Sequence, residues 1–286
     1  MNTVDGVVSF SESMNPRELV AYALRLEELG YGSLWLPDLF GRELFSTAGF
    51  ILGNTTRLQV ATGIANVYAR DAMSAAQGAR TLSELYEGRF VMGLGVSHPQ
   101  AAEMRGHEWI APVSKLRAYL EGIAAAKVMS PEPPKTAPIY IAAHGPKLLA
   151  LAATHADGAN TYLMPPDHTR EARGILGDEK ALNVVLPCCL CDDERRARQT
   201  ARKGLAMYLG LPAYHRQWRR FGFSDGDFAD GGSDRLVDSA IAWGDEAAIR
   251  KRMDAHMQAG ATRIEIIGYN PGGRGHDWKL LETFAR

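Results

Sequence analysis

Cysteine is scarce in this sequence, occurring three times in 286 residues, as Cys188, Cys189 and Cys191. An odd number of neighbouring cysteines cannot form a disulfide framework, and the CCLC spacing is not that of the usual zinc-ligand motifs. On a strand, Cys189 and Cys191 would share one face while Cys188 would point to the other, which argues against a shared metal. We therefore expect three reduced core residues and no metal site.

Long apolar runs and an excess of one charge are also missing. No window reaches the roughly 18 apolar residues of a membrane helix, and the start MNTVDGVVSF lacks a basic segment followed by a long apolar one. The net charge of -1 gives no reason to expect nucleic acid or an anionic membrane as the main partner. These absences favour a cytoplasmic protein that binds a small molecule; a homodimer is left open.

The sequence does contain a regular alternation of apolar strand-like runs and helical stripes. Near-continuous apolar runs are typical of parallel strands covered by helices. Eight such strands, in a chain that is 46% apolar, predict one (β/α)8 TIM barrel, a single domain over residues 1–286. A doubly wound open sheet is the alternative. The expected strands are residues 4–10, 33–37, 58–64, 89–96, 138–143, 158–163, 183–190 and 263–269.

Helix signals lie between these strands. Asn15 is the expected N-cap of the first helix, with Pro16 in its first turn, Glu18 completing a capping box and Gly30 closing it. Two apolar stripes at helical spacing predict helices that pack on the barrel. They are Ala72, Ala75, Ala79, Leu82 and Tyr86, and Leu148, Leu151 and Ala152.

Residues 192–262 form too long a connection for a single helix and contain the run FGFSDGDFADGGSD. We expect two helical parts around a Gly/Asp-rich loop, inserted between the seventh and eighth strands. Such an insertion is either a lid over the site or a plain surface loop. Its aromatic residues either line a substrate pocket or belong to a core. They are Tyr208, Tyr214, Trp218 and Phe221.

Several segments carry a family resemblance. The segments TGIANVYARD, AAQGARTLSELYEGRFVMGLGVSHP and IAAHGPKLLALAATHADGAN resemble the luciferase-like superfamily of flavin and deazaflavin oxidoreductases. The similarity extends almost end to end through LWLPDLFGRE, LGLPAYHRQWRRFGF and the segment GGSDRLVDSAIAWGDEAAIRKRMDAHMQAGATRIE, and is greatest to members that use the deazaflavin coenzyme F420. The resemblance implies a TIM barrel with the cofactor ring at its carboxyl-terminal mouth, and hydride transfer to or from a small organic substrate.

The same resemblance bears on the run QVATGIANVYARD, where polar groups and a glycine interrupt a buried strand. It implies a bulge with a non-prolyl cis peptide bond at Gly63–Ile64, whose backbone would lie behind the middle ring of the cofactor. Thr62 and Asn66 would then face the heteroatom edge of the ring. From the residues alone, an ordinary glycine kink at a barrel corner is the alternative.

Polar residues that follow different strands should meet at one mouth of a barrel. His98 is the first candidate for a proton donor, because an ordinary histidine pKa near 6.5 makes both protonation states accessible at neutral pH. A structural histidine is the alternative. Asp38 is the second candidate acid or base, although Leu39 follows it where relatives often have histidine, and Asp38 could instead cap the next segment. The expected mouth residues are Asp38, Asn66, Ser97, His98, His144 and Gly145.

A phosphate site is expected where the fifth strand turns into a helix. Pro146 at the first helical position should leave the amides of Lys147 and Leu148 without acceptors, next to the flexible Gly145. The resemblance places the cofactor phosphate near this turn. A rim of cations after the strands would serve the phosphate and the polyglutamate tail of the deazaflavin. These cations are Arg42, Arg70, Arg105, Lys147 and Arg170.

Three functions remain open at this point. The leading one is a deazaflavin-dependent oxidoreductase. The second is an FMN-dependent monooxygenase on the same barrel, and the third is a non-catalytic relative that binds a ligand, because no clear catalytic pair is visible. A Rossmann fold is not indicated, since GLGVSH has histidine where the dinucleotide fingerprint needs glycine and lies on a strand.

Overall fold

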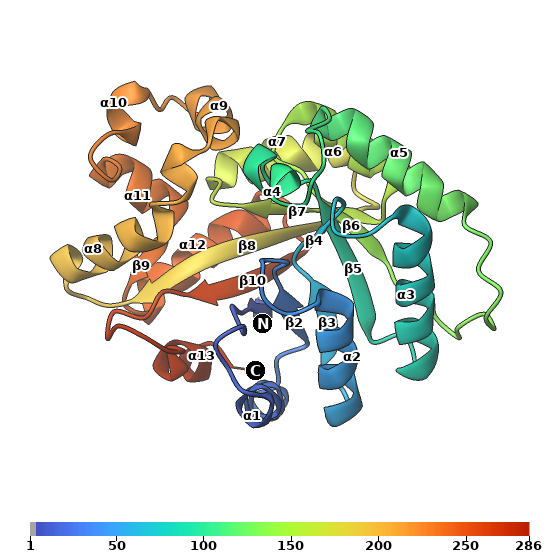
Figure 1. Cartoon of the computed structure of the whole chain (residues 1–286). Helices are drawn as coiled ribbons and strands as arrows, with labels where there is room; N and C mark the ends of the chain where they lie inside the picture. Colours follow the sequence, from blue (N-terminus) through green and yellow to red (C-terminus); the bar gives the residue numbers. More distant parts are fainter. Residues whose placement is uncertain (1–3, 286) are drawn as a thin grey trace. The chain divides into compact units, whose positions relative to one another are not determined.

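The computed structural model describes residues 4–285 and shows a closed parallel sheet with helices between its strands (Figure 1). The strand order is β10-β1-β2-β3-β5-β6-β7-β8-β9, and β10 also pairs with β8, so the sheet closes on itself. All strands but β4 and β9 are barrel strands, which confirms the predicted (β/α)8 fold. The bounds are β1 Val4–Val8, β2 Ser33–Leu36, β3 Gln59–Thr62, β4 Ala65–Asn66, β5 Phe90–Gly95, β6 Ile139–Ala142, β7 Gly158–Tyr162, β8 Ala181–Leu190, β9 Ala242–Gly244 and β10 Arg263–Gly268.

Helices follow the strands in the order expected for this fold. The first seven are α1 Pro16–Glu28, α2 Leu44–Asn54, α3 Ala72–Leu85, α4 Pro99–Glu103, α5 Pro112–Ala125, α6 Pro146–His155 and α7 Pro166–Leu176. The others are α8 Glu194–Leu205, the 3-10 helix η1 Tyr208–Gly210, α9 Pro212–Arg220, α10 Asp225–Phe228, α11 Asp234–Ala240, α12 Glu246–Gln258 and α13 Trp278–Thr283.

Each of the eight predicted strands is present, and the structure adds two short ones. β4 continues the third strand after a bulge and pairs with β5, with Ala65 opposite Leu94. β9 pairs with the end of β8, with Ala242 opposite Cys188. Strands of two or three residues give no periodic signal, so the sequence pattern could not show them.

The contacts divide the chain into two compact units. The amino-terminal unit comprises Gly6–Asn160 and Ile175–Ala181. The carboxyl-terminal unit comprises Thr161–Gly174 and the chain from Leu182 onward, with Val4 and Asp5. That the chain works as a single domain stays a prediction.

In the amino-terminal unit, the predicted helix signals are confirmed. The Asn15 side chain accepts from the Glu18 amide at 3.1 Å, while the Glu18 carboxylate accepts from the Asn15 amide at 2.7 Å, and this capping box starts α1. Helices α2 and α3 lie beside β3 and β5 (Figure 1). In α6 the buried stripe is shifted slightly from the prediction, because Leu149 rather than Leu148 is buried.

In the carboxyl-terminal unit, the segment after β8 holds more elements than the two helical parts predicted. The Gly/Asp-rich run contains helix starts, because its Ser and Asp residues act as caps. The Asp227 carboxylate accepts from the Ser224 amide at 2.8 Å and from the Ser233 hydroxyl at 2.6 Å, and the Ser233 hydroxyl accepts from the Leu236 amide at 3.2 Å. The Ser and Asp residues that cap these helices therefore give the segment the amino-acid composition of a loop.

The core of the carboxyl-terminal unit explains two further sequence features. Tyr214 and Trp218 are buried in it, and the Trp218 indole donates to the Leu163 carbonyl at 2.9 Å, so these aromatics are core residues. All three cysteines are free and buried, as predicted. Between residues 4 and 285, no helix is both long and apolar enough to cross a membrane, and no group of three or more His, Cys, Asp or Glu side chains could hold a metal.

Candidate active site

The predicted site residues all lie in the amino-terminal unit. They occupy the carboxyl ends of β2, β3, β5 and β6 and the segments that follow, the edge where barrel active sites form. All the predicted site residues therefore belong to one compact unit. Its residues are Asp38, Thr62, Gly63, Ile64, Asn66, Arg70, Ser97, His98, His144, Gly145, Pro146 and Lys147.

The bulge between β3 and β4 is present, and the predicted cis peptide bond at Gly63–Ile64 is confirmed. The Gly63 amide donates to the Leu36 carbonyl at 2.7 Å, and the Ile64 carbonyl accepts from the Asp38 amide at 3.1 Å. A side chain at position 63 would come within 3.2 Å of the Trp35 ring, so glycine allows the close approach. Ile64 is half-buried.

The side chain of Asp38 is only 5% exposed and is surrounded by donors. One carboxylate oxygen accepts from the Arg105 guanidinium at 3.3 Å. The other accepts from the Asn66 amide at 3.0 Å and lies 3.7 Å from the Arg70 guanidinium. Both oxygens are therefore engaged inside the protein.

Thr62 and Asn66 differ in whether their side chains keep a hydrogen-bonding group available for a ligand. Thr62 is fully buried, and its hydroxyl donates to the Gly93 carbonyl at 2.7 Å. Asn66 accepts from the Tyr68 amide at 2.9 Å through its side-chain oxygen. Its side-chain nitrogen donates to no residue between 4 and 285, so Asn66 keeps a donor for a ligand. That Thr62 faces a cofactor stays a prediction.

His98 follows β5 and precedes α4, next to Ser97 in the left-handed region at φ 59°. Its ring is half-buried and makes no hydrogen bond to any described residue. Burial lowers the pKa of His98 below its ordinary value. Burial therefore favours the neutral ring, which suits a proton acceptor better than the donor expected from the sequence.

The turn into α6 has part of the predicted anion site. Gly145 is the N-cap and offers no side-chain cap, and Lys147 is exposed in the first turn. The Leu148 amide donates to the Gly145 carbonyl at 3.1 Å, so the prediction of two free amides is wrong for Leu148. A 3-10 type bond at the helix start satisfies it. His144 is half-buried beside this turn.

The five predicted cations do not form a free basic rim, because four arginines have partners within the protein. Arg70 pairs with Glu43 at 2.7 Å as well as with Asp38. Arg42 donates to the carbonyls of Ser11 and Met14. Arg105 contacts Asp38, and Arg170, in the carboxyl-terminal unit, pairs with Asp167. Lys147 alone of the five has neither an ion pair nor a side-chain hydrogen bond among the described residues.

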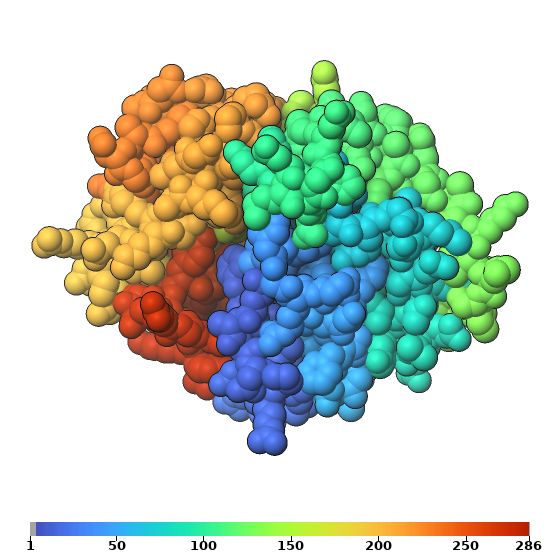
Figure 2. Space-filling view, in the orientation of Figure 1, coloured from blue at the N-terminus to red at the C-terminus, as the bar shows by residue number. Residues whose placement is uncertain are grey.

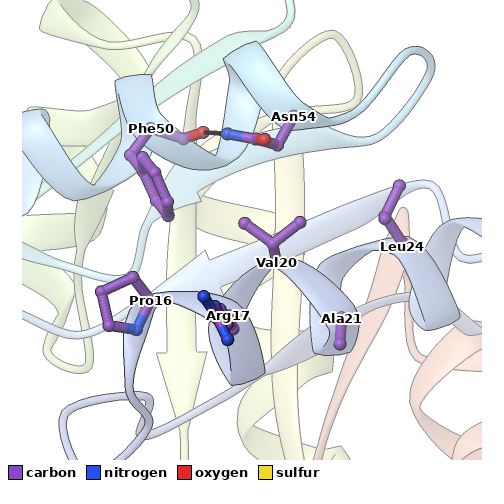
Figure 3. Close-up of a pocket in the computed structure, with 7 residues that line it drawn as sticks. All are labelled: Pro16, Arg17, Val20, Ala21, Leu24, Phe50 and Asn54. Atoms are coloured by element: carbon purple, nitrogen blue, oxygen red, sulfur yellow. Dashed lines mark hydrogen bonds between the residues drawn. The ribbon is translucent and has the colours of Figure 1, made fainter.

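A surface groove between α1 and α2 is separate from this site (Figure 3). Phe50 and Asn54 line it from α2, and the Asn54 side chain donates to the Phe50 carbonyl at 2.8 Å. None of the predicted site residues lines the groove. It lies on the helical outside of the amino-terminal unit and gives no functional assignment.

Comparison with known proteins decides the family. The profile of the luciferase-like monooxygenases matches residues 3–263. The chain belongs to this luciferase-like family. A 5,10-methylenetetrahydromethanopterin reductase from Methanolobus tindarius is 25% identical over 283 residues, covering 88% of this chain and 84% of that protein.

Solved structures share the luciferase-like fold over nearly the whole chain. An F420-dependent secondary alcohol dehydrogenase, in complex with an F420-acetone adduct, superposes with a TM-score of 0.78 at 16% identity, covering 99% of this chain and 97% of that one. The oxygenating constituent of a Pseudomonas putida 3,6-diketocamphane monooxygenase, in complex with FMN, has a TM-score of 0.67 at 16% identity, with 99% and 97% covered. These likenesses confirm the fold.

Sequence reasoning missed two glycines that shape this luciferase-like site. A side chain at position 93 would lie 2.0 Å from the Thr62 carbonyl oxygen, and one at position 95 would lie 2.8 Å from the Ile64 side chain. Position 93 must therefore be glycine for the bulge to sit against β5, because the obstructing atom belongs to the backbone, whereas a side chain at position 95 would require the Ile64 side chain to move. The spacing of Gly93 and Gly95 in FVMGLGV was the available signal, because alternate glycines on a strand indicate a close approach on one face.

Proposed function

We propose that this luciferase-like protein is a coenzyme F420-dependent oxidoreductase that transfers hydride to or from a small organic substrate. The observation that carries the proposal is the donor set of the α6 turn, where an uncapped helix start and the exposed Lys147 fit a phosphate. The reductase and dehydrogenase named above support it. We also propose a cytoplasmic protein that acts as one domain, binds no nucleic acid and can form a homodimer.

The residues of the amino-terminal unit have separable tasks in this proposal. When bound, the deazaflavin supplies two-electron hydride chemistry, so the protein must bind, orient and move a proton. The bulge at Gly63 and Ile64 supports the ring, and the Asn66 side-chain nitrogen donates to its edge. Gly145 and Lys147 hold the phosphate. Pro146 fixes the helix start between them.

His98 is the proton carrier in this proposal. Its neutral ring can accept a proton from a substrate hydroxyl as hydride leaves the adjoining carbon, and it returns the proton in the reverse direction. Asp38 is the weaker candidate, because both of its oxygens already have partners. Ser97, next to His98, and His144, next to the α6 turn, complete the proposed cofactor contacts.

An FMN-dependent monooxygenase is the second candidate, supported by the FMN-bound neighbour with the same fold. The two cofactors differ at the ring position where the deazaflavin has carbon in place of nitrogen, which disfavours oxygen activation. A non-catalytic relative is the third possibility. Binding measurements distinguish all three.

The test is a calorimetric or fluorescence titration of the purified protein with F420 and with FMN. We expect tighter binding of F420, and hydride transfer with a simple alcohol or ketone. Gly145→Val should weaken F420 binding about tenfold or more, because a branched side chain obstructs the approach of the phosphate. The fold should survive, since φ -102° and ψ 158° at this position are extended values that valine adopts. Equal or tighter FMN binding would contradict the proposal.

A further inference from the structure

Asp38 holds the bulge at two points. Its backbone amide donates to the Ile64 carbonyl at 3.1 Å, and its carboxylate accepts from the Asn66 amide at 3.0 Å. The two contacts lie on either side of Ala65, where the chain returns to the sheet as β4. One residue shortly after β2 therefore holds the segment proposed to support the cofactor ring at Ile64 and at Asn66.

The Asp38 carboxylate is in turn held by two arginines. Arg105 donates to one oxygen at 3.3 Å, and Arg70 lies 3.7 Å from the other. With the side chain 5% exposed, little of the carboxylate remains open to a substrate. Removing one arginine would leave a buried charge with fewer partners, so the position of Asp38 depends on both.

Arg105 comes from a different part of the chain, 67 residues after Asp38. It also donates to the Leu39 carbonyl at 3.1 Å, and its guanidinium lies 5.5 Å from the centre of the Phe40 ring. Three successive residues after β2 are thus held by one side chain. The teal-green surface of α4 and the residues after it is visible in Figure 2.

Arg70 completes the arrangement from the segment after β4. Its guanidinium pairs with Glu43 at 2.7 Å and lies 4.4 Å from the centre of the Phe45 ring. Since Arg70 is shared between Asp38 and Glu43, Arg105 is the partner whose charge is committed to Asp38. Among the described residues, Arg105 makes no other ion pair.

We propose that Arg105 is a positioning residue for the cofactor site, which acts by holding Asp38 and through it the bulge from Gly63 to Asn66. Asp38 is then also a positioning residue and exchanges no proton with the substrate. This inference rests on the proposed function only for the identity of the ligand. The contacts themselves are made within the unliganded protein.

The first arm of the test needs no cofactor. Hydrogen exchange of the Asn66 amide should be slow in the parent and clearly faster in Arg105→Gln and Asp38→Asn. Arg105→Gln removes the charge that holds the carboxylate in place, and Asp38→Asn leaves a single neutral oxygen that cannot serve both Arg105 and the Asn66 amide. Arg42→Gln is the matched control, since Arg42 binds carbonyls of a neighbouring loop and does not contact Asp38. Unchanged Asn66 exchange in Arg105→Gln would overturn the proposal.

The second arm measures the dissociation constant for F420. Arg105→Gln and Asp38→Asn should each raise this constant about tenfold. Because the two residues act as one unit, combining the changes should raise the constant no further than the more harmful single change does. Arg105→Lys should recover part of the affinity. Additive effects, or an Arg105→Gln variant that binds as the parent does, would overturn the proposal.

The third arm separates positioning from proton transfer. If Asp38 only positions, the pH profile of turnover at saturating F420 keeps its shape in Asp38→Asn. Loss of one limb of that profile with unchanged affinity would make Asp38 an acid or base and overturn the inference. Failure of the parent to bind F420 would refute the proposed function. The hydrogen-exchange measurement would still decide whether Arg105 positions Asp38 and the bulge. Should Asp38→Asn not fold, the two Arg105 variants decide it alone.

Discussion

At the scale of single residues, His98 is the side chain best suited to proton transfer. We expect His98→Asn to lower turnover by roughly 10²- to 10⁴-fold, the usual loss for a general acid or base, while the F420 dissociation constant stays near that of the parent. Asparagine keeps the polarity but does not titrate in the relevant range. Steady-state kinetics and a binding titration measure the two quantities separately; unchanged turnover would make His98 structural.

The lowered pKa of His98 also predicts how turnover should change with pH. Burial disfavours the charged ring, so the neutral form persists to a lower pH than the ordinary value of 6.5. Oxidation of an alcohol, which needs the neutral ring, should remain active below pH 6.5 and fall only when the ring protonates. In His98→Asn this acid limb should be absent.

The sequence showed which residues gather at the site but not what each one binds there. Asp38, His98 and Lys147 were found because each follows a strand, and the barrel rule alone brings such positions together. The partners were not visible, since Arg105 and Asp38 are 67 residues apart and only the folded chain makes them neighbours. For the same reason Arg70 was expected to be a free cation and is instead engaged by Asp38 and Glu43.

At the scale of elements, the pairing of β3 with β5 depends on a missing side chain. Gly93→Ala would place a methyl group 2.0 Å from the Thr62 carbonyl oxygen, an atom of the backbone that cannot swing away. We expect a loss of about 1–3 kcal/mol or more in the free energy of unfolding, measured by urea denaturation. Gly174→Ala in α7 is the control, because nothing lies within 4 Å of its added methyl group.

That control should behave in the opposite way. Alanine is favoured over glycine inside a helix by up to about 1 kcal/mol, so Gly174→Ala should stabilise the protein slightly. A Gly93→Ala variant as stable as the parent would mean that the two strands are not this close in solution.

The elements themselves were largely predictable, and the exceptions have physical causes. Eight apolar runs gave the barrel strands because buried parallel strands need continuous apolar sequence. Amino-acid composition was misleading only where the same residue types occur both in loops and at helix N-caps. The serines and aspartates between 224 and 234 are typical of loops, yet Ser224 and Ser233 begin helices there.

At the scale of the whole molecule, a buried histidine should make stability depend on pH. His256 is fully buried, and burial together with the nearby Arg252 lowers its pKa to about 3. In the unfolded chain the ring would titrate near 6.5, so the unfolded state binds the extra proton as the pH falls. The folded state should therefore lose about 1.4 kcal/mol per pH unit between roughly pH 6.5 and pH 3.

Urea denaturation at several pH values measures this slope. His256→Gln should have a shallower slope in the same window, whatever its stability at pH 7. His155→Gln is the control, because His155 is partly exposed and lies 3.9 Å from Glu121 on the surface. An equal slope in His256→Gln and the parent would exclude His256 as the cause.

The three cysteines around the end of β8 give the molecule a built-in chemical reporter. All are buried, and burial raises the pKa of Cys189 to about 12 and that of Cys188 higher still, so almost no thiolate forms at these two residues in the folded state near neutral pH. A maleimide or a disulfide reagent added to the native protein has little to attack. Each molecule that opens in this region exposes thiols, and the rate of their labelling then counts the openings of the carboxyl-terminal unit without any engineered probe.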